Sequence, residues 1–196
     1  MKKSLVSFLL FNCVYSFASA QTPSYKQPAT VGIHFLFNDF ATAADIRNSS
    51  LSSVLNNKRF GKLKDMPQGL AITYGKGISD NFDFVSMLAG SFLNYPVPSR
   101  EQESNEALLF EGDVSIRGKM FSDHYWFVPF LQLGAGVSQY KGYWGTYIPA
   151  GVGIQINFFD EAYIVINSQY RIAVSETASY HFVHSIGLVG NIGKRD

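Results

Sequence analysis

His184 and Ser185 stand side by side near the end of the chain, and Glu176 lies shortly before them. These are the residue types of a serine hydrolase triad, in which a histidine activates the serine and a carboxylate orients the histidine. The pair belongs to an alternating apolar segment that predicts a β-strand, where successive side chains point to opposite faces. His184 and Ser185 therefore cannot share one site. Because the chain also lacks a G-x-S-x-G turn, we predict that it is not an enzyme.

Other residue types that carry chemistry are sparse. The histidines form no H-x-x-x-H pattern and have no cysteine partners, so we predict no metal site. The glycines of GAGV and AGVG are not followed by the helix that a nucleotide site requires, so we predict no cofactor. We interpret these glycines as places where a missing side chain leaves room for a long residue from across the barrel or allows sharp curvature of the wall. They are Gly134, Gly136, Gly151 and Gly153.

Charged and amide side chains recur at every second position in two parts of the chain. In residues 108–117 acidic and basic side chains alternate with large apolar ones, and in residues 152–172 amides alternate with isoleucines. On an extended chain this period sends the apolar side chains to one face and the polar side chains to the other. Charges on an enclosed face need partners, because a buried unpaired ion is costly. We predict an ion pair between Glu111 and Arg171. The polar network around it is predicted to include Asp113, Arg117 and Gln169.

Eight segments carry this alternation and predict eight β-strands. The FFDEA break between the sixth and seventh is long enough only for a tight reversal, which makes that pair antiparallel. Most segments reach the ~9 to 11 residues that a tilted strand needs to cross a bilayer, and membrane barrels have an even number of strands. We predict an all-β fold, an eight-stranded antiparallel up-and-down transmembrane β-barrel. Its expected strands are residues 30–40, 69–78, 82–93, 108–118, 127–140, 148–157, 163–172 and 182–192.

The alternation leaves two orientations of the wall to compare. In a membrane barrel the isoleucines face lipid and the polar residues fill the interior, whereas in a secreted, lipocalin-like barrel the apolar face turns inward and binds a small apolar ligand. The second orientation would expose the small and polar residues of segment 148–157, which suit a narrow lumen better. We favour the membrane barrel, with a lumen plugged by polar side chains. The secreted carrier is the alternative, followed by a lipid-modifying enzyme of the outer membrane.

Connections and aromatic residues support the membrane barrel. Longer connections, at residues 41–66, 94–106, 142–147 and 174–181, alternate with short turns, as expected of outer loops and periplasmic turns. Aromatic residues gather near both sets of strand ends, as two interfacial girdles would. The predicted outer girdle is Phe40, Tyr95, Tyr140, Tyr143, Trp144, Tyr147 and Tyr180. The predicted inner girdle is Phe82, Tyr125, Trp126, Phe127, Phe158, Phe159 and Tyr163.

The first twenty residues predict export. Lys2 and Lys3 precede an apolar stretch, and Ala-Ser-Ala at the end of residues 1–20 is a cleavage signal, so we predict a signal peptide there and a barrel domain at 21–196. The only cysteine, Cys13, lies in this leader. The whole chain has 16 basic and 15 acidic residues, and loss of Lys2 and Lys3 leaves 14 basic ones. This near-neutral balance argues against a nucleic-acid partner.

Residues 41–66, between the first two strands, carry an excess of basic side chains. Ile46, Leu51, Val54 and Leu55 have helical spacing, which predicts a short amphipathic helix. The basic side could meet lipopolysaccharide head groups or an external ligand, and a solvated loop is the alternative. The basic residues are Arg47, Lys58, Arg59, Lys62 and Lys64.

Three stretches resemble a known family. They are PAGVGIQINFFDEAYIVINSQYR, HFVHSIGLVGNIGK and DFATAADIRNSSLSSVLNNKRFGKLKDM. Together they resemble the β-barrel domain of OmpA-like outer membrane proteins, and the resemblance spans nearly the whole chain after residue 20. It implies a barrel in the outer membrane of a Gram-negative bacterium that anchors or stabilises the cell envelope. The family's periplasmic peptidoglycan-binding domain is expected to be absent here.

Overall fold

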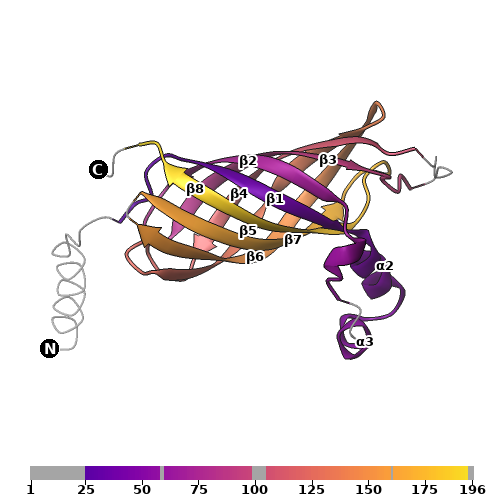
Figure 1. Ribbon diagram of the computed structural model, residues 1–196, viewed down its shortest axis with the longest axis horizontal. Coiled ribbons are helices and arrows are strands. Elements are labelled where there is room, and N and C mark those ends of the chain that lie inside the picture. Colours follow the sequence, from indigo (N-terminus) through magenta and orange to yellow (C-terminus); the bar gives the residue numbers. More distant parts are fainter. Residues whose placement is uncertain (1–24, 58–59, 99–104, 160, 194–196) are drawn as a thin grey trace, which may run out of the picture.

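The computed structural model describes residues 25–57, 60–98, 105–159 and 161–193. Eight antiparallel strands close into a barrel in which each strand pairs with its neighbours in sequence and β8 pairs with β1 (Figure 1). The predicted fold is therefore confirmed, while the predicted signal peptide at 1–20 lies outside the described residues. The strands are β1 (Thr30–Asp39), β2 (Gln68–Gly77), β3 (Phe82–Leu93), β4 (Ala107–Lys119), β5 (Phe127–Tyr140), β6 (Tyr143–Phe159), β7 (Ala162–Ala173) and β8 (His181–Asn191).

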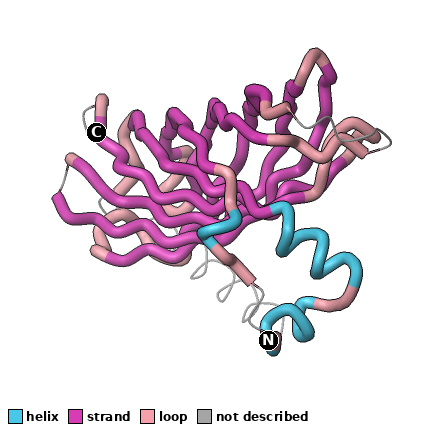
Figure 2. The backbone as a smooth tube through the Cα atoms, turned by 45° about the vertical axis from the view of Figure 1, so that its right-hand side comes forward, coloured by secondary structure: helices cyan, strands magenta, loops and turns pink. Residues whose placement is uncertain are grey.

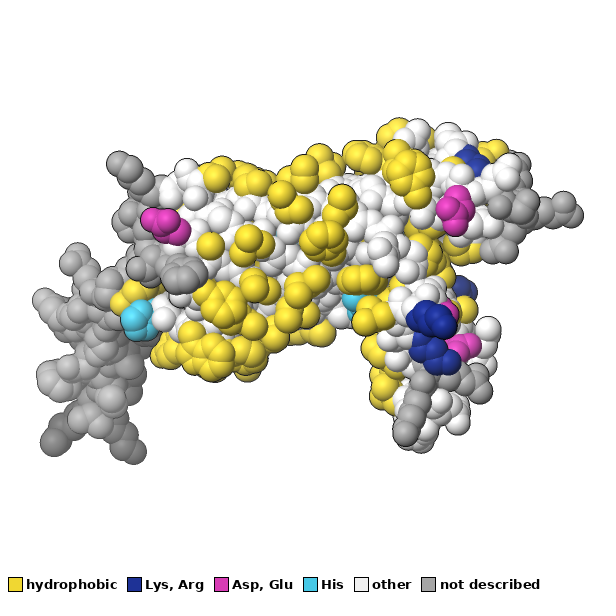
Figure 3. All heavy atoms as spheres, viewed as in Figure 1, with side chains coloured by type: hydrophobic (Ala, Val, Ile, Leu, Met, Phe, Trp, Pro, Cys, Tyr) yellow, Lys and Arg dark blue, Asp and Glu magenta, His cyan; other side chains and the backbone are white. Residues whose placement is uncertain are grey.

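Alternation along each strand separates two faces of the wall. On β1, Ile33 and Phe35 are 61% and 62% exposed, whereas His34 between them is 4% exposed. The same alternation continues around the barrel, so hydrophobic side chains cover much of the outer wall in Figure 3. We refer to this outward apolar surface as the belt. In the described strands, charged and amide side chains such as Glu111, Gln155 and Arg171 lie on the inward face, which does not fit the apolar interior of the lipocalin-like alternative.

In β3 the alternation of apolar and polar residues is weaker than in the other strands. Outward positions include Phe82, Leu88 and Phe92. Asp83 points inward, and so do the small or flexible side chains at every second position after it. Both faces of β3 are apolar over most of its length. Only Asp83 and Ser91 distinguish the inward face, because both are polar and buried.

The connection between β5 and β6 differs from the expected loop at 142–147. The two strands meet at Lys141 and Gly142, which have φ values of 47° and 85°, the signs required by a tight type I′ hairpin turn. β6 therefore begins at Tyr143 instead of residue 148. The pair forms a tall hairpin at the end of the barrel away from the termini (Figure 1). Glycine tolerates the left-handed backbone, so the turn needs no longer loop.

The predicted aromatic girdles are partly wrong. Tyr140 and Tyr147 lie at inward positions of β5 and β6, and Tyr163 lies at an inward position of β7. Tyr95, in the connection after β3, is also buried. These four tyrosines fill the interior. Trp144, Phe82 and Trp126 are exposed at strand ends, as a girdle requires.

Three short helical pieces follow β1 at the end of the barrel opposite the start of β1 (Figure 2). We call this end the outer end, and the end where β1 begins and β8 ends the inner end. They are α2 (Phe40–Asn48), α3 (Leu51–Asn56) and the 3₁₀ turn η1 (Leu63–Asp65). The single predicted helix is thus divided in two, because Ser50 begins a new helix by accepting a hydrogen bond from the backbone N–H of Ser53 (3.2 Å). No helix in the described ranges is long and apolar enough to cross a membrane.

Glycines thin the wall where large interior side chains approach it. A Cβ at Gly136 or Gly153 would overlap the ring of Tyr147 or Phe130, respectively. Each ring belongs to the register partner on the neighbouring strand, and not to a residue across the interior as predicted. Gly134 is more demanding, since a Cβ there would overlap the backbone carbonyl of Val114 on β4. Backbone cannot move aside without opening the sheet.

We expect Gly134→Ala to destabilise the barrel by about 1–3 kcal/mol, because the added methyl group forces β4 and β5 apart. The matched control is Gly90→Ala, whose Cβ would meet only Leu108 at 3.6 Å, an ordinary contact. Urea unfolding of both variants in lipid vesicles measures the difference. Equal unfolding midpoints for the two variants would contradict the close approach at Gly134.

Candidate functional site in the lumen and at its outer mouth

Arg171 lies at the centre of an ion cluster in the outer half of the lumen. Its guanidinium is fully buried and pairs with Glu111, and its Nη2 lies 3.9 Å from Asp113 Oδ2. The Tyr147 ring lies beneath it, with its centroid 4.8 Å from the Arg171 Cζ. The predicted Glu111–Arg171 ion pair is confirmed. We call Glu111, Asp113, Arg171, Tyr147 and His181 the outer ion cluster.

Four strands supply this cluster. β4 contributes Glu111 and Asp113, which share the inward face two residues apart, while β6, β7 and β8 contribute one side chain each. Ser115 Oγ donates to Asp113 Oδ1 (3.1 Å) and Tyr147 OH donates to Asp113 Oδ2 (3.5 Å). His181 Nε2 lies 3.6 Å from Glu111 Oε1. Each carboxylate therefore has more than one polar neighbour, as buried ions require.

Arg117 does not join this cluster, contrary to the prediction. It lies six residues from Glu111 along β4, and its guanidinium covers the Phe130 ring, 4.2 Å from the centroid. Alternation places both residues on the inward face but does not say how far apart they lie along the barrel axis. Six residues along a strand span about 20 Å. Gln169 lies two residues from Arg171 on β7 and is buried opposite Gly151.

A second charged group, absent from the sequence prediction, occupies the inner end. Lys119 Nζ lies 3.0 Å from Asp83 Oδ1 and 2.7 Å from Asp123 Oδ2, and Gln155 Nε2 donates to Asp123 Oδ1 (3.0 Å). We call these four residues the inner ion cluster. Lys119 continues the alternation of Glu111, Asp113 and Arg117, so extending the fourth predicted strand by one residue would have included it.

The segment before β1 closes the inner end of the barrel. Gln27 is buried, and its amide can donate to Asp123 Oδ2 (2.9 Å). The backbone N–H of Gly77 donates to the Gln27 carbonyl (3.0 Å), and that of Ile192 donates to the Ala29 carbonyl (2.8 Å). These contacts attach residues 27–29 to the ends of β2 and β8. The inner ion cluster is thus covered by the chain itself.

An aromatic and apolar group closes the outer end. Leu93, Tyr95, Leu109 and Tyr140 pack together in the lumen above the outer ion cluster. Phe40, the first residue of α2, packs against this group and stacks on His181, with ring centroids 4.6 Å apart. Tyr140 OH donates to the Leu93 carbonyl (3.1 Å). The outer ion cluster is therefore shielded from the solvent at the mouth.

The hydrolase-type residues do not assemble. Ser185 is buried in the lumen, His184 projects from the outer wall, and Glu176 is exposed in the connection after β7. His184 instead faces Asp39, with 3.8 Å between Nε2 and Oδ2. Within the described residues, no group of three His, Cys, Asp or Glu side chains is placed to hold a metal ion.

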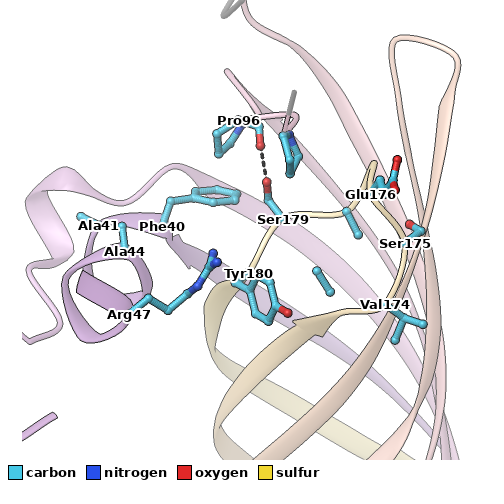
Figure 4. Close-up of a pocket in the computed structure, with 13 residues that line it drawn as sticks. Phe40, Ala41, Ala44, Arg47, Pro96, Val174, Ser175, Glu176, Ser179 and Tyr180 are labelled. Atoms are coloured by element: carbon cyan, nitrogen blue, oxygen red, sulfur yellow. Dashed lines mark hydrogen bonds between the residues drawn. The ribbon is translucent and has the colours of Figure 1, made fainter. Parts of the chain in front are cut away.

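A pocket of about 650 Å³ opens at the outer rim between α2, the connection after β3 and the connection after β7 (Figure 4). Phe40 and Ala44 form one wall, and Pro96 lies across from them. The Arg47 guanidinium lies over the Tyr180 ring, 4.2 Å from its centroid. This rim pocket combines apolar surface with one cation, Arg47, and one carboxylate, Glu176. On the side of Phe40 and Arg47 it could hold an apolar group with an anionic end. Ser179 donates to the Pro96 carbonyl at its floor.

The basic residues predicted between β1 and β2 lie on the surface. Arg47, Lys62 and Lys64 are exposed, and Arg47 also lines the rim pocket. Lys58 and Arg59 lie outside the described residues. The three described cations come from α2 and from the return toward β2.

We expect Glu111→Ala to lower the free energy of unfolding by about 3–5 kcal/mol, because Arg171 would remain buried without its main partner. In the double variant Glu111→Ala/Arg171→Met no buried guanidinium remains, so the loss should be smaller than the sum of the two single losses. Denaturant unfolding of Glu111→Ala, Arg171→Met and the double variant in lipid vesicles measures this coupling. Additive losses would show that the pair contributes no interaction of its own.

Comparison with known proteins identifies structural neighbours only. No family model matches the chain, and none of the curated proteins matches its sequence. The N-terminal β-barrel domain of Pseudomonas aeruginosa OprF matches with a TM-score of 0.52 at 9% identity, over 84% of this chain and 98% of that one. Ail of Yersinia pestis (TM-score 0.49, 13% identity, 84% and 97% of the chains) and Neisserial surface protein A (0.46, 14%, 84% and 96%) also match. The chain therefore has the fold of the OprF barrel domain.

Proposed function

We propose that this chain is an integral outer-membrane protein of a Gram-negative bacterium, a closed barrel with a structural or surface-interaction role in the cell envelope and no catalytic activity. The observation that carries the proposal is the belt. Ile72, Leu131 and Leu188 are each at least 60% exposed on different strands. Soluble monomers rarely expose a contiguous apolar surface larger than a few hundred Å². Acyl chains are the environment that such a wall fits.

The height of the wall agrees with a bilayer. β1 has 10 residues, which at about 3.3 Å each and a tilt of about 40° rise about 25 Å, the height of the apolar band of outer-membrane barrels. Barrel closure also leaves no strand edge exposed, as the hydrocarbon region requires. The termini lie at one end and α2 and α3 at the other (Figure 1), which supports placing the helices on the outer side.

The filled lumen argues for a structural role and against a pore. An eight-stranded barrel has an interior just wide enough for side chains. Here the outer ion cluster fills one half of the lumen, and the inner ion cluster fills the other half together with the group around Phe130 and Tyr163. Arg171, Leu93 and Leu109 are at most 1% exposed, so solvent does not reach the outer cluster through the mouth.

The surface role belongs to the outer connections. The described cations Arg47, Lys62 and Lys64 suit outer-membrane lipids and lipopolysaccharide, whose head groups are anionic. The rim pocket offers a second place, where an external ligand with an apolar body and an anionic end would lie between Phe40 and Arg47. Both features lie at the end of the barrel where the helices are.

We expect Ile72→Arg to reduce the stability of the barrel in lipid by about 2–4 kcal/mol, because a charge would enter the middle of the belt. The matched control is Ile78→Arg, which changes an exposed isoleucine beyond the end of β2. Heat-modifiable gel migration and urea unfolding in vesicles test both variants. A purified wild-type protein that stays folded and monomeric without detergent would refute the membrane assignment.

Wild-type protein in planar bilayers is expected to show no steady ion current, because two ion clusters and an aromatic group fill the lumen. The double variant Glu111→Ala/Arg171→Ala removes the side chains at the centre of the outer cluster and should introduce current steps in a fraction of insertions. The control is Ile78→Arg, outside the lumen. A conducting wild-type barrel would contradict the plug.

A further inference from the structure

The residues between β1 and β2 form a compact unit beside the barrel. We define the lateral segment as the described residues 40–57 and 60–66. In Figures 1 and 2, α2 and α3 lie to one side of the outer end of the barrel and do not continue its axis. An element in this position runs along the surface of a bilayer that surrounds the belt. It does not extend into the medium.

Several hydrogen bonds fix the lateral segment to the wall. The Thr42 N–H donates to Asp39 Oδ1 (2.8 Å), which caps α2, and the Asn38 N–H donates to the Pro67 carbonyl (2.9 Å), which joins the two ends of the segment. The Gly61 N–H donates to Thr42 Oγ1 (3.2 Å), and Val54 is buried. The unit therefore has its own small core and a defined orientation.

One side of the lateral segment is apolar although no protein covers it. Leu51, Leu55 and Leu63 are 51%, 53% and 60% exposed. Leu51 and Leu55 are four residues apart on α3 and so share a face. In Figure 3 hydrophobic side chains gather on the edge of this unit that turns back toward the belt. Solvent-exposed loops do not need leucines at three such positions.

The apolar side of the segment is continuous with the belt. Phe60 packs against the outer wall at Phe182 and His184, with ring centroids 5.8 Å and 6.1 Å apart. Leu63 lines an apolar groove of about 430 Å³ together with Phe37 and Ile186, both outward residues of the wall. Lipid that surrounds β8 and β1 would therefore also contact Leu63.

The charges of the segment favour a lipid over a second copy of the chain. In sequence, residues 41–66 hold five basic residues and two acidic ones, an excess that would repel the same surface of another copy. The described cations are Arg47, Lys62 and Lys64, all exposed. Exposed basic residues next to exposed leucines are the composition of segments that lie in a membrane interface.

We propose that the lateral segment is an interfacial anchor, with Leu51, Leu55 and Leu63 in the acyl boundary of the outer leaflet and Lys62 and Lys64 against the phosphates of anionic lipids. The proposal rests on the membrane location proposed above. It assigns these two lysines to lipid phosphate and makes the segment a second point of attachment beside the barrel wall.

Spin labels on single cysteines test this anchor. The labels replace Leu55, Asn56 and Ile72 in a Cys13→Ser background, in nanodiscs of phosphatidylcholine mixed with phosphatidylglycerol. Asn56 is the matched control, because it follows Leu55 on α3 but lies away from the Leu51–Leu55 face. Ile72 reports on the belt. The ratio of accessibility to oxygen over accessibility to a water-soluble nickel complex should be several-fold higher at 55 and 72 than at 56.

The three labels separate the two proposals. A lipid-like ratio at 72 with equal, water-like ratios at 55 and 56 would leave the barrel in the membrane and overturn the anchor. Water-like ratios at all three positions would overturn the membrane location itself. A label at 55 that is shielded from both reagents would show a protein partner on this face and also overturn the anchor.

The role of the cations has its own comparison. Lys62→Gln/Lys64→Gln should lower the ratio at 55 in discs that contain phosphatidylglycerol and leave it unchanged in discs of phosphatidylcholine alone. The matched variant Lys26→Gln, an exposed lysine at the other end of the barrel, should have no effect at 55 in either lipid. An equal effect of the double variant in both lipids would overturn the assignment to lipid phosphate.

Discussion

β1 and β8 pair along ten residue positions, from Thr30 opposite Asn191 to Asp39 opposite Phe182, and this pairing closes the wall. Closure satisfies the backbone groups of both terminal strands, which no solvent could do in hydrocarbon. It also divides every strand into an outward and an inward face. The belt, the two ion clusters and the position of the lateral segment all depend on that division, because an open sheet would leave both faces in one medium.

Enclosure then determines what the lumen can contain. Ions carry a high desolvation cost in a dry interior, so each buried charge of this barrel is found next to an opposite one or over an aromatic ring. Arg171 lies between Glu111 and the Tyr147 ring, and Lys119 lies between two aspartates. Because each ion has its partner on another strand, a shift in register would leave charges unpaired, and the clusters thereby favour one strand alignment.

The fold could be predicted from the sequence because a period of two is a local signal, and Leu108 to Ile116 display it without reference to any other strand. The Glu111–Arg171 pair was accessible because both residues lie near the same strand ends. The positions of residues along the barrel axis and the exact ends of the strands were harder to predict. Arg117 shares a face with Glu111 but not a level, and Lys119 lay one residue beyond the expected strand. Tyr147 was assigned to a girdle because the Lys141–Gly142 turn, which extends β6 to Tyr143, depends on left-handed backbone. Tyr140 was assigned to a girdle from its place at the end of a predicted strand, although its position in the alternation points inward.

The two ends of the barrel differ in how the chain leaves the strands, and Asp39 fixes this direction at the outer end. At the inner end, short turns and residues 27–29 close the wall with backbone hydrogen bonds. At the outer end, Asp39 ends β1, caps α2 through Thr42 and faces His184 on the outer wall. One side chain thus couples the last strand pair to the direction in which the chain leaves the barrel. The Asn38 N–H donates to the Pro67 carbonyl, so the points where the chain leaves β1 and returns to β2 are held next to each other. The lateral segment therefore takes its orientation from the wall.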